Sequence, residues 1–528
     1  MTELRRMMMC LVVCVAVGMA VFGCASSLSN RRGLTTHSLG EPSTLNPILA
    51  MDSASSVLND WVFNGLLKVN EQLELEPDLA QSYHWSEDGK TITFILKKNI
   101  VWHDGAPFTA KDVVFTFHKI LDPSTRTVRR SMVVVDGKPI QFKAINAYTV
   151  QAILPKPFAP FLTGMTMSIL PHHLLEHVDI HTTTFNRHPI GTGPFKFVSW
   201  QTGQYLKIAR FDHYFGQKAK LDTITVKIIP DSNNALIALQ KKEIDACDIP
   251  PKDRERIQKL PHLSLFQYDG LEYTYLGFNL HHPFLSDKRV RQAIAHGINK
   301  DALVAHVLNH QGRVAHLPSS PVLWTYPPDA MIPVFAYDPS RSHALLKQAG
   351  FHQNKSGFYE KNGHVFELTL LTNKGNKTRE KTTELIQQYL QKIGIKTSIQ
   401  IMEWSALIKR LNEASPKSFD AVVLGWAIGI EPDAYAIWHS SQYPQGFNFI
   451  GYNNPAVDRL LVQGRETMDR EARKSIYATL YATIARDVPA VFLYYPKTTV
   501  GIHKRVKGLS NPGPAGMMHR IESVFIAP

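Results

Sequence analysis

The alternation of apolar and polar positions predicts strands and helices along most of the chain. In residues 91–99, TITFILKKN, apolar residues alternate with polar ones, as in a half-buried strand. In residues 108–121, FTAKDVVFTFHKIL, apolar residues recur at the spacing of a helix with one buried face. Thr109 is a good N-cap for that helix, and Asp112 stands at its third position.

The C-terminal half repeats these patterns in turn. Helices are expected within residues 337–351 and 378–394 and after Trp404, and strands within residues 395–401, 419–426 and 490–495. Asp338 and Pro339 favour the start of the first of these helices, whereas Gly350 and Gly394 favour helix ends. Strands that alternate with helices are typical of layered α/β architecture.

Length and composition fit a large globular protein. A chain of 528 residues predicts two or three domains, and its 44% apolar and 20% charged content is sufficient for ordinary cores. The net charge is +13, but the basic residues are scattered, with only short pairs such as Lys97-Lys98. Nucleic-acid binding usually needs a concentrated basic stripe, so no nucleic-acid partner is expected.

The N-terminus has the features of an export signal. Arg5 and Arg6 precede a short apolar run that ends in VFGC, residues 21–24. The run is short for a membrane span. Val21, Gly23 and Cys24 fit a bacterial lipobox, although Phe22 is bulky for its position. Cleavage before Cys24 would remove residues 1–23 as a signal peptide and leave a lipidated cysteine as a membrane anchor; the alternatives are a plain signal peptide or an uncleaved anchor.

The cysteines predict no internal disulfide. Cys10 and Cys14 would leave with the signal and Cys24 would carry the lipid, so Cys247 alone remains. We expect it to be a buried or half-buried spectator.

Candidate metal and catalytic motifs are weak. HLLEH, residues 173–177, matches the H-x-x-E-H signature, in which His173 and His177 would bind zinc and Glu176 would act as a base. Pro171 precedes the motif, and no further carboxylate ligand can be assigned. The His-His pairs at 172–173 and 281–282 lack a third ligand, and GTGPF at 191–195 lacks the ending of a phosphate loop. We therefore expect no metal, no cofactor and no enzymatic activity.

Several segments resemble one family in its order. The matching blocks are residues 75–117, 189–200, 275–304, 337–351, 390–404, 419–439 and 448–461. They resemble blocks of the family 5 extracellular solute-binding proteins, the peptide- and nickel-binding subunits of ABC importers. The resemblance covers nearly all of the chain that would follow the signal peptide.

The resemblance implies an α/β fold of the two-lobed Venus-flytrap type, a type II periplasmic binding protein with an extra inserted domain in lobe I. The implied limits are 25–68, 189–268 and 505–528 for lobe I, 69–188 for the inserted domain and 269–504 for lobe II. GTGPF would then serve turn geometry where the chain re-enters lobe I.

The resemblance also implies ligand-binding positions. Trp404 falls where an indole lines the cleft. Gly425, Trp426, Ala427 and Ile428 fall on a strand end that offers its backbone to an extended ligand. On the lobe I side, Asn46 and the stretch from Asp52 to Val57, with Ser53, match the cleft wall.

The segment departs from the family at one charged position. In oligopeptide and dipeptide binders an Asp three residues after the strand-end Trp pairs with the α-ammonium of the ligand, and here that place is Gly429. Glu431 and Asp433 are candidates for a shifted acid. The alternative is that both cap the next turn or helix, because Pro432 and Asp433 are good helix-start residues.

The expected function is therefore ligand capture for an ABC importer, with a peptide as ligand, permease and ATPase subunits as partners, and a monomeric protein on the lipid anchor. Alternative ligands are a cell-wall peptide, a nickel chelate, for which only His439 lies nearby, or a sugar. Alternatives from other classes are a zinc peptidase using the HLLEH motif and an envelope chaperone or adhesin that does not close.

Overall fold

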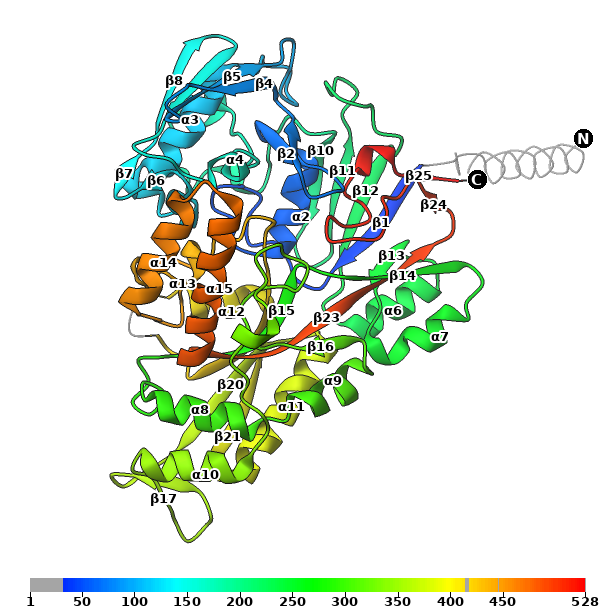
Figure 1. Cartoon of the computed structure of the whole chain (residues 1–528). Coiled ribbons are helices and arrows are strands. Elements are labelled where there is room, and N and C mark those ends of the chain that lie inside the picture. Colours follow the sequence, from blue (N-terminus) through cyan, green and yellow to red (C-terminus); the bar gives the residue numbers. More distant parts are fainter. Residues whose placement is uncertain (1–31, 414–416, 445, 528) are drawn as a thin grey trace, which may run out of the picture.

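Two lobes make up the protein, and strand β23 (Ala490–His503) passes from one into the other (Figure 1). The computed structural model describes residues 32–413, 417–444 and 446–527. The expected signal peptide and Cys24 lie outside these residues.

Lobe I is built on a four-stranded sheet in the order β1-β12-β11-β10, in which β1 and β12 are parallel. Its elements are β1 (Gly33–Ser38), α2 (Ser53–Val62), β10 (Phe195–Gln201), β11 (Tyr205–Arg210), β12 (Thr223–Ile228), α6 (Ser232–Gln240), β13 (Ala246–Asp248), α7 (Arg254–Gln258), β14 (Leu263–Asp269), β24 (Val506–Lys507) and β25 (Phe525–Ile526).

The inserted domain is an antiparallel sheet in the order β4-β5-β9-β8, against which helix α3 packs. Its elements are β2 (Leu67–Val69), β3 (Leu75–Pro77), β4 (Ala80–Trp85), β5 (Thr91–Leu96), α3 (Ala110–Leu121), the 3₁₀ segments η1 (Pro123–Thr125) and η2 (Val128–Met132), β6 (Val134–Val135), β7 (Lys138–Pro139), β8 (Gln141–Asn146), β9 (Thr149–Ile153), α4 (Phe161–Gly164), α5 (His172–Leu175) and the 3₁₀ segment η3 (Thr184–Asn186). One apolar core joins this domain to lobe I, so the two form a common body.

Lobe II is an α/β layer with an apolar core on each face of its sheet. Its strands are β15 (Glu272–Phe278), β16 (Gly312–Val314), β17 (His352–Gln353), β18 (Tyr359–Lys361), β19 (His364–Val365), β20 (Glu367–Asn373), β21 (Lys396–Met402), β22 (Ala421–Ala427) and the first part of β23. Its helices are α8 (Lys288–Gly297), α9 (Lys300–Leu308), α10 (Pro339–Gln348), α11 (Lys377–Lys392), α12 (Trp404–Leu411), α13 (Tyr435–Trp438), α14 (Pro455–Glu466) and α15 (Arg470–Asp487).

Two antiparallel crossover strands connect the lobes. The first part of β23 pairs with β15 in lobe II, and the last part pairs with β14 and β13 in lobe I. The chain from β14 into β15 is the second crossing, and only Gly270 and Leu271 separate these strands. Motion of one lobe against the other is therefore restricted to bending of these paired strands.

The strand and helix pattern read from the sequence is confirmed, with its capping chemistry. Thr109 and Asp112 form a capping box at the start of α3. Asp338 accepts the backbone N–H of Arg341 at the start of α10, and Gly350 follows its end with φ +88°. Strand β23 extends well beyond the expected 490–495, because its later residues pair in lobe I.

The GTGPF segment needs its glycines for close packing rather than for a left-handed turn. A Cβ on Gly191 would lie 1.9 Å from the carbonyl oxygen of Val62, and one on Gly193 would lie 2.6 Å from that of Trp61. Neither glycine has a positive φ. The segment therefore holds the re-entering chain directly against the end of α2.

The lobes also touch at both ends of their interface, away from the crossovers. Near one end, Ser232 donates its N–H to the carbonyl of Gly375 at 3.0 Å, and Lys377 pairs with Asp231 at 3.1 Å. At the other end, Lys156 of the inserted domain pairs with Glu466 of α14 at 2.7 Å. These contacts define a closed arrangement of the lobes.

The close packing at Gly191 yields a stability prediction. Gly191→Ala should lower the free energy of unfolding by roughly 1–3 kcal/mol, because the added methyl group meets rigid backbone. Gly513→Ala is the control, since its nearest neighbour would lie 3.9 Å away. Urea denaturation followed by circular dichroism measures both, and equal midpoints for the two variants would contradict the packing argument.

Candidate functional site

A cavity of about 610 Å³ lies between the lobes beside the crossover strands. Lobe I lines it with β1, α2 and β13, lobe II with Asn373, Asn376, Arg379 and Trp404, and the C-terminal segment with residues 515–519. Its volume falls in the range of enclosed small-ligand sites.

The lobe II wall lies at the carboxyl ends of parallel strands, where α/β sheets bind ligands. Strand β20 is flanked by β21 on one side and by β22 on the other. Strands β20 and β22 pair only at Leu370 with Ala421 and at Leu371 with Val422. Beyond these pairs the backbone ladder ends, although the Thr372 hydroxyl still donates to the carbonyl of Val423 at 3.1 Å. Helix α11 follows β20.

Among the described residues that line this wall, Arg379 is the one strong cation, and the sequence analysis did not identify it. It lies in the first turn of α11 and donates a hydrogen bond to Oδ1 of Asn373. None of the described residues forms an ion pair with it, and burial lowers the pKa of its guanidinium. A side chain at Gly425 would come within 3.3 Å of Nη2, so the glycine leaves room for the guanidinium.

The position of Arg379 at the start of a predicted helix could have identified it as a candidate ligand-binding residue from the sequence. An arginine in the first turn of a helix that follows a strand adds a mobile cation to the partial positive charge of the helix N-terminus. The arrangement can bind a carboxylate or another anion.

The lobe I wall carries two carboxylates, Asp60 and Asp248. Both reach the solvent of the cavity, and neither accepts a hydrogen bond or joins an ion pair within the described ranges. Burial raises the pKa of Asp60 to about 6, against an opposing effect of Arg129. Burial likewise raises the pKa of Asp248, and the charge of His37 opposes the shift.

Trp404 closes the cavity against lobe I. It is the first residue of α12, and a Cβ on Gly40 would lie 2.7 Å from its Cδ1. Its buried indole N–H has no acceptor in the part of the chain that the structure describes. The side chain thus offers an apolar face and a hydrogen-bond donor.

The backbone of the strand end is held on one side only. Gly425, Trp426 and Ala427 pair with Thr274, Tyr273 and Glu272 of β15. Trp426 stacks on Phe449 with centroids 6.2 Å apart. Ile428 donates its N–H to Leu271 at 2.7 Å, while Ala427 and Gly429 are exposed. The residues from Gly425 to Gly429 lie outside the lining of the 610 Å³ cavity.

Glu431 and Asp433 are engaged within lobe II. Glu431 pairs with Arg473, and Asp433 pairs with Arg465 at 3.1 Å. Burial raises the pKa of Glu431, and the Arg473 guanidinium opposes that shift. Asp433 also accepts the N–H of Tyr435, the first residue of α13, at 3.1 Å.

The two lobe I candidates occupy different places. Ser53 begins α2 and lines the cavity, with Val57, Asp60 and Trp61 on the same face of the helix. Asn46 is fully buried and donates to Asn186 at 3.0 Å. Asn46 therefore contacts the chain that leaves the inserted domain, outside the lining of the cavity.

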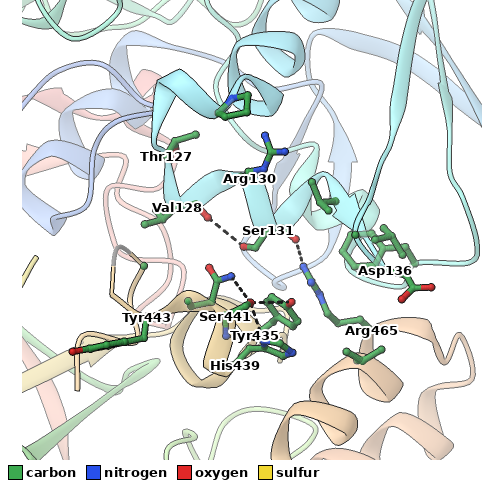
Figure 2. Close-up of a pocket in the computed structure, with 18 of the residues that line it drawn as sticks. Thr127, Val128, Arg130, Ser131, Asp136, Tyr435, His439, Ser441, Tyr443 and Arg465 are labelled. Atoms are coloured by element: carbon green, nitrogen blue, oxygen red, sulfur yellow. Dashed lines mark hydrogen bonds between the residues drawn. The ribbon is translucent and has the colours of Figure 1, made fainter. Parts of the chain in front are cut away.

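A second cavity, of about 820 Å³, lies between the inserted domain and lobe II, as Figure 2 shows. Ser131 of η2 lies across it from Tyr435 and His439, whereas the Arg130 side chain points away and donates to the carbonyl of Leu121. Arg465 donates to the carbonyl of Ser131. The guanidinium of Arg465 also lies over Tyr435, 4.1 Å from its ring centroid. The loop from Gly425 to Tyr435 runs from the Arg379 side of the interface to this second cavity.

The HLLEH motif does not form a zinc site. Helix α5 is only His172–Leu175, and the side chains turn to separate partners: His173 lies 2.7 Å from Asp104 and His172 lies 3.0 Å from Glu176. Within the described ranges no group of three or more His, Cys, Asp or Glu side chains could hold a metal ion.

Two α/β lobes, two crossover strands and a cavity between the lobes define the class of two-lobed binding proteins. The family model of the bacterial extracellular solute-binding proteins, family 5 Middle, matches residues 74–448. The oligopeptide-binding protein AppA of Bacillus subtilis is 35% identical over 94% of this chain and 91% of its own. Its structure with a nonapeptide superposes with a TM-score of 0.90, covering 94% of this chain and 100% of the other at 34% identity.

Other solved relatives hold different ligands. DppA from Helicobacter pylori in complex with the peptide STSA has a TM-score of 0.85 at 28% identity, over 94% and 99% of the two chains. NikZ from Campylobacter jejuni in complex with Ni(L-His) has a TM-score of 0.84 at 27% identity, with the same coverage.

The chain belongs to the family 5 extracellular solute-binding proteins. It is a solute-binding component of an ABC importer and not an enzyme. Among the helices of the described residues, none combines the length and apolar character that a membrane crossing requires.

The raised pKa of Asp60 predicts a pH dependence of stability. Between its ordinary pKa of 3.8 and about 6 the folded protein holds a proton that the unfolded chain releases, so this contribution to stability is lost as pH rises. Asp60→Asn removes the effect. The melting temperature of the variant relative to wild type should therefore rise from pH 4 to pH 7.

Asp88→Asn is the control, because hydrogen bonding from Ser86 lowers the pKa of that exposed carboxylate. Thermal denaturation across the pH series measures all three proteins. A constant difference between Asp60→Asn and wild type would contradict the assigned pKa.

Proposed function

We propose that this protein captures peptides between its lobes and delivers them to the permease and ATPase subunits of an importer. The observation that carries the proposal is Arg379, an arginine without an ion-pair partner among the described residues, at a helix N-terminus in the wall of the interlobe cavity. Such a group suits the terminal carboxylate of a peptide.

An open strand edge supports the same ligand class. From Val423 to Ala427, β22 pairs with β15 on one side, while its pairing with β20 ends at Val422. An extended peptide can add to such an edge through its main chain, which gives affinity without side-chain selection. Gly425 to Ile428 are the proposed backbone contacts, with Trp404 and Ser53 on the two cavity walls.

Closure would supply the signal that the permease detects. The hinge consists of the crossings at 269–272 and 494–497, within the domain limits implied by the family. Lipidation at Cys24 would keep a monomeric binding protein at the membrane surface, close to the permease.

Native mass spectrometry of the tag-free protein tests the ligand class. The protein purified from its source should carry a ladder of peptide masses that is released on unfolding. A single defined non-peptide compound, or a nickel chelate, would overturn the peptide assignment while leaving the family intact.

Arg379→Gln should weaken binding of peptides with a free carboxyl terminus by about tenfold to a hundredfold, since one charge-assisted contact contributes about 1.5–3 kcal/mol. C-terminally amidated copies of the same peptides should bind the variant and wild type equally. Lys381→Gln is the control, because Lys381 is an exposed position on the same helix and pairs with Glu384.

The comparison uses peptides of a casein hydrolysate in free-acid and amidated forms, with captured peptides counted by mass spectrometry. Equal loss of both forms in Arg379→Gln would contradict a carboxylate contact.

A further inference from the structure

We propose that lobe I binds the ammonium group of the ligand through Asp248, with Asp60 beside it on the cavity wall. The inference rests on the proposed function, and it assigns the two ends of the ligand to opposite lobes. Arg379 on lobe II takes the carboxylate, and the carboxylates of lobe I take the positive charge.

The position of Asp248 makes it the main contact. It is the last residue of β13, a strand that pairs with β23 at the crossover. Asp248 lines the cavity and is exposed to its solvent. His37 on β1 lines the same wall, and its buried Nδ1 has no partner in the described chain.

The charges around Asp248 leave it without a cation of its own. Burial raises the pKa of Asp248 and the charge of His37 opposes that shift, while burial lowers the pKa of the His37 imidazole. Glu272 on β15 is a second carboxylate nearby. Burial raises its pKa, the negative charge of Asp248 adds to that shift, and the positive charge of Arg379 opposes it. A ligand ammonium would give the Asp248 carboxylate, which has no ion-pair partner among the described residues, a charge-assisted contact.

Asp60 extends the negative wall along α2. Ser53, Val57 and Asp60 lie on one face of that helix, so a polar group, an apolar group and a carboxylate line the cavity in sequence. Burial raises the pKa of Asp60, and the charge of Arg129 in the inserted domain opposes that shift without forming an ion pair with Asp60. The Arg129 guanidinium instead donates a hydrogen bond to the carbonyl of Ala50 at 3.3 Å.

The loop acids of lobe II do not compete for this role. Arg473 and Arg465 already pair with Glu431 and Asp433. Gly429 has no side chain to offer. The negative charge of the cavity therefore lies on lobe I, opposite to Arg379.

This polarity couples ligand charge to closure. A peptide with both termini charged would bridge the lobes, with its carboxylate on α11 and its ammonium on β13. A ligand that lacks either charge would contact only one lobe strongly. Both charges are thus recognised most strongly when the lobes are closed.

The test is a competition between a casein hydrolysate and an N-acetylated copy of it, mixed in equal amounts. Wild type should capture the free-amine form in roughly tenfold or greater excess, as for a desolvated charge pair. Asp248→Asn should bring the ratio close to one, and Asp60→Asn should lower it in part. Asp212→Asn, a surface carboxylate of lobe I paired with Arg210, should keep the wild-type ratio.

Peptides without lysine report on the α-ammonium, and lysine-containing peptides add the side-chain ammonium. Equal capture of both forms by wild type would overturn the inference, and this needs no variant to fold. So would an unchanged ratio in Asp248→Asn and Asp60→Asn, or loss of discrimination in Glu431→Gln instead. Capture of neither form by wild type would contradict the proposed function itself, which separates the two failures.

Discussion

The continuity of β23 is the constraint on which the rest of the structure depends. Along its 14 residues it pairs with β15 and β16 in lobe II and then with β14 and β13 in lobe I. Because the strand cannot shear without breaking both ladders, the lobes can approach only by bending at the crossings. The cavity beside this hinge changes shape as the strands bend, and Asp248 lies on a strand paired to β23.

The chemistry of the cavity follows from which charges the fold has already satisfied. A carboxylate that already pairs with an arginine is not available to bind a ligand, whereas an unpaired carboxylate in the cavity favours binding of a ligand cation. Glu431 and Asp433 belong to the first kind, and Asp60 and Asp248 to the second. Arg379 completes the set from the other lobe. The protein therefore presents a dipolar cavity, which suits a zwitterionic ligand.

Much of the fold could be predicted from the sequence. Apolar periodicity and the caps at Thr109 and Asp338 locate helices, and ordered segment resemblance identifies the family. The contacts that decide binding could not be predicted this way. Arg379, Asp60 and Asp248 lie far apart in the sequence and meet only through the crossover topology. Likewise, nothing local in GIEPDAY reveals that its acids have arginine partners on α14 and α15.

The central claim is that a peptide spanning the two lobes closes them. The distance between spin labels at Lys143→Cys on the inserted domain and Lys474→Cys on lobe II measures closure directly. Both positions are exposed, whereas Cys247 is buried and has a raised thiol pKa, which disfavours its labelling. Adding casein peptides should shift the distance distribution to shorter values. An unchanged distribution in protein shown to hold peptide would contradict the account.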